Sequence, residues 1–82
     1  MVWFFTRSRE RVQMDTFYDN DANEFVLRLY FPDGTRSVER FDSITRFREG
    51  IDRAERKLAA DRWAQEGRPL FIPEGFPKRR LN

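Results

Sequence analysis

The segment Asp19-Asn20-Asp21-Ala22-Asn23 has the spacing with which oxygen ligands open a calcium-binding loop. In such a loop the sixth position is a glycine that allows a sharp turn, and the twelfth supplies a bidentate carboxylate. Here those positions are Glu24 and Tyr30, so neither requirement is met. Asp and Asn in succession are also typical of an ordinary turn between strands. We therefore interpret the segment as a turn and predict no metal site and no cofactor.

The commonest catalytic side chains are missing from the sequence. It contains no histidine and no cysteine, which excludes Ser-His and Cys-His nucleophiles, thiolate metal sites and disulfides. The carboxylates fall in expected turns or on the charged side of an expected helix, where nothing in the pattern encloses them in a pocket. The sequence also lacks a glycine-rich phosphate loop. We therefore predict a protein that is not an enzyme.

Arginine and aromatic residues share one face of an expected hairpin over residues 25–41. Rings beside guanidinium groups can stack bases and neutralise phosphates in single-stranded nucleic acid. The alternative is that long arginine stems simply cover a solvated sheet face. The candidate nucleic-acid residues are Arg28, Tyr30, Arg36 and Arg40.

The distribution of charge favours the second interpretation of that face. Residues 1–41 contain six Arg or Lys and seven Asp or Glu, and residues 42–67 contain six of each. Residues 68–82 contain four basic residues and one acidic residue, so the net charge of +2 lies at the C-terminal end. A nearly neutral body lacks the basic surface expected of a nucleic-acid binder.

The hairpin that positions these residues turns at Pro32-Asp33-Gly34. Proline sets the first corner of a type I turn, and glycine takes the left-handed position that closes a bulged loop. This loop places Leu29 opposite Ser37 and Leu27 opposite Glu39. The aliphatic and aromatic side chains of the ribbon then face a core, and its arginines face water.

Two earlier runs and one later run supply the remaining elements. Residues 2–6 and 12–18 have the alternation of strands, which completes a four-stranded antiparallel meander. A helix is expected after Asp42-Ser43, either of which can cap its free backbone amides. Gly50 flanks the apolar stripe of this helix, and close approach of a strand or an aromatic ring is the expected reason. The stripe consists of Ile44, Phe47, Ile51, Ala54 and Leu58.

The opposite side of the helix carries oppositely charged residues four apart. Each such pair is worth about 0.3–0.5 kcal/mol and indicates a solvated face. The predicted ion pairs are Asp42–Arg46, Arg48–Asp52, Glu49–Arg53, Asp52–Arg56 and Lys57–Asp61.

The C-terminal residues form an apolar, proline-rich tail. Proline recurs every fourth residue from Pro69, which excludes a regular helix and favours extended backbone. Trp63 lies about 150° from the helix stripe at 100° per residue, so the helix ends near Asp61 or Trp63 makes a second contact. Either the tail and Trp63 form a protein interface, or the tail folds back with Trp63 and Trp3 to complete a small core. The candidate interface residues are Trp63, Leu70, Phe71, Ile72 and Phe76.

The chain resembles a group of short bacterial proteins over most of residues 3–77. They share a W-F-F opening, a P-D-G turn, an E-R-F sequence and one amphipathic helix that ends near a tryptophan. These are Trp3-Phe4-Phe5, Pro32-Asp33-Gly34, Glu39-Arg40-Phe41 and Trp63 here. The group has no established activity, so the resemblance implies no functional residue. The order of elements is also similar to the Whirly-type single-strand DNA-binding fold, an analogy of architecture alone.

The sequence therefore predicts an α+β protein. We expect a four-stranded antiparallel β-meander with one amphipathic α-helix packed on one face at residues 1–67. An extended Pro-rich C-terminal tail at residues 68–82 is expected to dock on this domain or on a partner. The expected function is a small non-enzymatic protein-interaction module, a homodimer or an accessory subunit, with single-stranded nucleic-acid binding as the alternative. No export signal or membrane span is recognised, so we expect a cytoplasmic protein.

Overall fold

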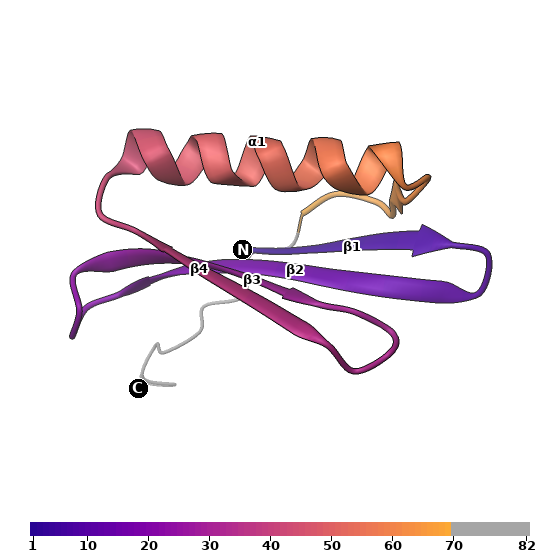
Figure 1. The fold of residues 1–82 in the computed structure, drawn as a ribbon, viewed down its shortest axis with the longest axis horizontal. Coiled ribbons are helices and arrows are strands. Elements are labelled where there is room, and N and C mark those ends of the chain that lie inside the picture. Colours follow the sequence, from indigo (N-terminus) through magenta and orange to yellow (C-terminus); the bar gives the residue numbers. More distant parts are fainter. Residues whose placement is uncertain (70–82) are drawn as a thin grey trace, which may run out of the picture.

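A computed structural model describes residues 1–69 of the chain. The elements are β1 (Val2–Arg7), β2 (Glu10–Asp19), β3 (Glu24–Tyr30), β4 (Arg36–Phe41), α1 (Ile44–Ala60) and β5 (Ala64–Gln65). The strands form one antiparallel sheet in the order β4-β3-β2-β1-β5, and α1 lies across one of its faces (Figure 1). The predicted α+β meander with one helix on one face is confirmed. The expectation of four strands is corrected to five, because β5 adds a short strand beside β1.

The hairpin of β3 and β4 has the predicted register. Leu27 lies opposite Glu39 and Leu29 opposite Ser37. Gly34 has a φ of 90°, the left-handed conformation that the bulged loop requires. The register therefore turns Leu27 and Leu29 of β3 toward α1.

The core lies between α1 and the face of the sheet that α1 covers, which we call the helix face. Strand alternation and register assign the side chains of the opposite face, which we call the second face. The buried residues of the core cluster are Phe5, Val12, Met14, Leu27, Leu58 and Trp63. The second face consists of Val2, Phe4, Thr6, Arg11, Gln13, Asp15, Phe17, Asp19, Glu24, Val26, Arg28, Tyr30, Arg36, Val38 and Arg40.

The helix begins where predicted, but fewer ion pairs form on its surface than predicted. Ser43 is its N-cap, and the Ser43 hydroxyl accepts a hydrogen bond from the Arg46 backbone N–H at 3.2 Å. Of the five predicted ion pairs only Asp52–Arg56 forms within residues 1–69, because exposed pairs gain too little to fix two long side chains. No helix in that same range has the length and apolar character needed to cross a membrane.

Gly50 is buried where α1 crosses the end of β4. A Cβ atom at this position would lie 3.0 and 3.1 Å from the two Cε atoms of the Phe41 ring and closer still to its Cζ. The Phe41 ring therefore occupies the space that any other residue would need. The predicted close approach of an aromatic ring is confirmed.

The C-terminal end of α1 is closed by a left-handed residue, Arg62, with a φ of 69°. Its N–H donates to the carbonyl of Ala59, and the Trp63 N–H donates to the carbonyl of Leu58 at 2.9 Å. These two bonds form a Schellman motif, and its usual apolar contact is supplied by Leu58 and Trp63 in the core cluster. The helix thus ends before Trp63, as one of the two predictions required.

Candidate functional site

The second face contains a hollow of about 490 Å³ beside β4. All four residues of the predicted nucleic-acid face line it, so the structure brings them together. The full lining is Phe17, Val26, Arg28, Tyr30, Arg36, Val38 and Arg40.

Arg28 is fixed in this hollow by a paired carboxylate. Its Nε and Nη2 atoms donate to Asp15 Oδ1 at 2.9 Å and Oδ2 at 2.8 Å. Asp15 lies opposite Arg28 in the register of β2 and β3, so backbone pairing alone brings the two groups together. The guanidinium carbon lies 4.5 Å from the centre of the Phe17 ring and 5.8 Å from that of Tyr30. The Arg28 guanidinium is thus paired with a carboxylate and lies within cation–π distance of two aromatic rings.

Arg40 is paired at the edge of the same hollow. Its Nη1 atom donates to Asp19 at 3.1 Å and to Glu24 at 3.4 Å. The hydrogen bond from Arg40, with the backbone N–H groups of Ala22 and Asp21, holds the pKa of Asp19 below its ordinary value of 3.8. The same bond to Asp19, with that to Glu24, raises the pKa of Arg40.

The electrostatic balance of the hollow follows from these pairs. Arg28 and Arg40 each face a carboxylate, and within residues 1–69 Arg36 forms no ion pair. Phosphate binding draws its strength from basic groups whose charge is not already neutralised. The hollow therefore resembles a neutral, ring-lined protein surface more closely than a basic groove.

Within residues 1–69 no strand pairs with the outer side of β4, which is therefore an edge of the sheet. Phe31 and Thr35 form a hydrogen-bonded pair, so the alternate positions Arg36, Val38 and Arg40 turn their backbone N–H and C=O groups outward. The Val38 side chain is 53% exposed. Such a strand offers a row of backbone groups to another strand, with an apolar side chain next to it.

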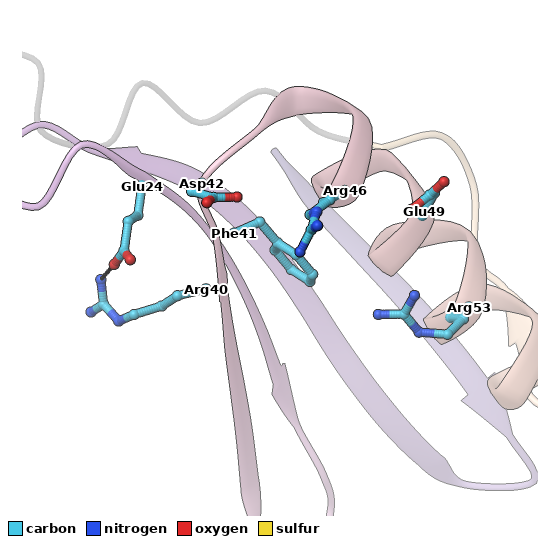
Figure 2. Close-up of a pocket in the computed structure, with 7 residues that line it drawn as sticks. All are labelled: Glu24, Arg40, Phe41, Asp42, Arg46, Glu49 and Arg53. Atoms are coloured by element: carbon cyan, nitrogen blue, oxygen red, sulfur yellow. Dashed lines mark hydrogen bonds and ion pairs between the residues drawn. The ribbon is translucent and has the colours of Figure 1, made fainter.

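A second hollow of about 640 Å³ lies on the other side of β4, toward α1 (Figure 2). Arg46 and Arg53 project toward it from α1, and Glu24 pairs with Arg40 at its far side. Its lining contains three arginines and three carboxylates, so it presents no net charge to a ligand. The lining is Glu24, Arg40, Phe41, Asp42, Arg46, Glu49 and Arg53.

Trp63 is buried in the core cluster, with the guanidinium carbon of Arg7 4.3 Å from the centre of its ring. Its ring is part of the domain's own core. The other four predicted interface residues, Leu70, Phe71, Ile72 and Phe76, lie outside the described residues.

Two further features decide what the site can do. Sequence reasoning missed Asp15, because its role appears only when the register of β2 and β3 is known. Asp19, predicted to lie in a turn, accepts hydrogen bonds from the Asp21 and Ala22 backbone N–H groups at 3.0 and 3.2 Å. In the described part of the chain no three acidic residues are grouped to hold a metal ion.

Comparison with family models, curated proteins and solved structures yields no match.

Proposed function

We propose that this chain is a small non-enzymatic protein-interaction module that binds a protein partner through β4 and the adjoining hollow of the second face. The observation that carries the proposal is the free edge at Arg36, Val38 and Arg40 beside a ring-lined hollow. In strand addition, backbone bonds supply affinity and alternate side chains enter pockets that supply specificity. The site has both components.

The composition of the hollow supports a protein ligand. Tyrosine, phenylalanine and arginine are enriched where proteins bind one another, and Tyr30, Phe17 and Arg28 adjoin Val38 here. The rings are held by the Arg28–Asp15 pair before any ligand arrives. A preorganised surface loses less side-chain freedom on binding.

The charges of β4 favour a different protein over a second copy of this chain. In a two-fold pairing centred on Val38, Arg36 would lie opposite Arg40 of the other copy. In one centred on Glu39, that carboxylate would lie opposite itself. Like charges directly opposite destabilise an antiparallel pair. Two of the two-fold pairings of β4 with a second copy are therefore disfavoured, whereas an accessory subunit of a larger assembly need not meet either conflict.

The test compares two exposed apolar residues on different elements. A partner captured from the protein's own cells is identified and purified, and its Kd is measured for the wild type, Val38→Lys and Ile44→Lys. Val38 is 53% exposed on β4 and Ile44 is 45% exposed on α1, so both changes place a charge at a surface position. We expect Val38→Lys to weaken binding about tenfold or more and Ile44→Lys to change it less than about twofold. Equal affinities for all three proteins would contradict the proposal.

Single-stranded nucleic acid is the second candidate, because Arg28, Tyr30, Arg36 and Arg40 do line one hollow. That function requires affinity for a labelled oligonucleotide that falls steeply with salt and weakens in Tyr30→Ala. Fluorescence anisotropy at low salt measures both. Our proposal expects no salt-dependent binding, and a steep salt slope together with weaker binding by Tyr30→Ala would replace it with this alternative.

A further inference from the structure

The hollow between α1 and the end of β4 contains two arginines that form no ion pair within residues 1–69. Arg46 follows Asp42 by four residues, the spacing at which such pairs can form on a helix. Arg53 follows Glu49 by the same interval. Figure 2 shows both guanidinium groups extended toward the hollow and the Glu49 carboxylate pointing away from it. The two cations therefore face open space and not their nearest carboxylates.

The charges of this hollow are balanced in number but not evenly arranged. Glu24, at the far side, already accepts a hydrogen bond from Arg40 at 3.4 Å. With that pair closed and Glu49 pointing away, Arg46 and Arg53 have only the Asp42 carboxylate to offset them. Guanidinium groups form strong, charge-assisted hydrogen bonds to carboxylates. The side of the hollow next to α1 is therefore suited to one further carboxylate.

A strand added to the outer side of β4 would pass along this hollow. Its side chains opposite Arg36, Val38 and Arg40 would lie on the second face, and those between them on the helix face. The side chain opposite Phe41 would then lie on the helix face, where Phe41 lines the hollow. Glu39, the preceding helix-face residue of β4, is not part of the lining and would repel an acidic residue opposite itself. One position of the added strand therefore meets the hollow.

We propose that the carboxylate of an acidic residue in the partner strand enters this hollow and binds Arg46 and Arg53. The inference rests on the proposed function and names the chemistry of the partner. In an antiparallel strand, an Asp or Glu opposite Phe41 comes three residues before an apolar residue opposite Val38. The residue three before Val38 in β4 of a second copy is Thr35, so that strand does not supply the carboxylate.

Selection from a displayed peptide library tests this pattern. Random peptides of about nine residues, a common strand length, are displayed on yeast and sorted with labelled tetramers of the full chain. We expect the wild type to enrich Asp or Glu at least about fivefold at the third position before an apolar residue. The double variant Arg46→Gln, Arg53→Gln should lose this enrichment. The matched control Arg48→Gln, at an exposed position of α1 outside the hollow, should keep it. Acid enrichment that is absent in the wild type, or unchanged in the double variant, would overturn the proposal.

A second arm separates this inference from the proposed function. Val38→Lys changes the edge strand and leaves Arg46 and Arg53 in place, so it should abolish the preference for the apolar residue, which the double variant should keep. An apolar preference that depends on Val38, without acid enrichment, would overturn the acidic ligand and leave strand addition standing. Acid enrichment that depends on Arg46 and Arg53 but is unchanged in Val38→Lys would support the acidic ligand and overturn strand addition.

Discussion

Met14 and Asp15 are neighbours on β2 whose side chains point to opposite faces of the sheet, and both are buried. Met14 packs in the core cluster under α1, where contacts are apolar and non-directional. Asp15 holds Arg28 through two hydrogen bonds, and the guanidinium is stacked on Phe17. One strand thus contributes an apolar side chain to the helix face and a charged side chain to the second face.

The difference shows how a small domain divides stability and recognition between its faces. The helix face stabilises by removing apolar area from water, a contribution that depends little on side-chain direction. The second face orients rings and charges, which adds less net stability because desolvating an ion pair offsets much of its attraction. Substitutions on the helix face should therefore cost more than substitutions on the second face.

The largest effect is expected from Met14→Ala on the helix face. Met14 is fully buried, and truncation of such a residue removes apolar contact and leaves a cavity. We expect a loss of about 3–4 kcal/mol in the free energy of unfolding, measured by urea denaturation. Met14→Leu conserves volume and should cost less than about 1.5 kcal/mol. Equal losses for the two variants would show that the site is loosely packed.

On the second face, Asp15→Ala should cost about 1.5–3 kcal/mol, because it removes both carboxylate acceptors from Arg28. The double variant Asp15→Leu, Arg28→Met should be more stable than Asp15→Ala, since it leaves no charge without its partner. Denaturation of the single and double variants gives the coupling free energy. Strictly additive losses would contradict a coupled pair.

A smaller loss is expected where the helix face is tightest, in Gly50→Ala. The added Cβ overlaps the Phe41 ring, and overpacking of this kind costs about 1–3 kcal/mol, reduced by the roughly 1 kcal/mol that alanine gains in a helix. Thr45→Ala, at an exposed position of α1, is the control and should be neutral or slightly stabilising. Stabilisation by Gly50→Ala would mean that Phe41 moves freely.

The smallest effect is a pH dependence of the loops that adjoin the second face. Bonds from Arg40 lower the pKa of Asp19, and those from the backbone N–H and hydroxyl of Thr35 lower that of Asp33. Both folded values lie below the ordinary 3.8, so protons bind the unfolded chain first. The stabilisation is present above about pH 4 and is lost as pH falls through the folded values. Urea midpoints between pH 5 and pH 2 should decline less steeply in Asp19→Asn; parallel curves would refute this.

The hairpin and the second-face hollow were predictable from local chemistry. Pro32-Asp33-Gly34 specifies a register, and a period of two then places Arg28, Tyr30, Arg36 and Arg40 together. The ion pair of Asp15 was not predictable, because the turn before β3 carries no comparable register signal. It is closed instead by Asn23 in the left-handed conformation, with a φ of 56°.

The short strand β5 escaped prediction for a related reason. Its two residues are too few for an alternation pattern, and its position depends on where α1 ends. That end is set by Arg62 in a left-handed conformation, where glycine is the usual signal. The prediction of ion pairs on α1 failed for a different reason. Their spacing permits contact, but water competes for the exposed charged groups.

The pairing of β1 with β5 also has a consequence for how the chain is made. Ala64 and Gln65 join β1 from nearly sixty residues away along the sequence. During synthesis the first strand therefore keeps an unpaired side until almost all of the folded part has left the ribosome. We expect its Trp3-Phe4-Phe5 stretch to be open to unwanted pairing in the nascent chain until that late closure.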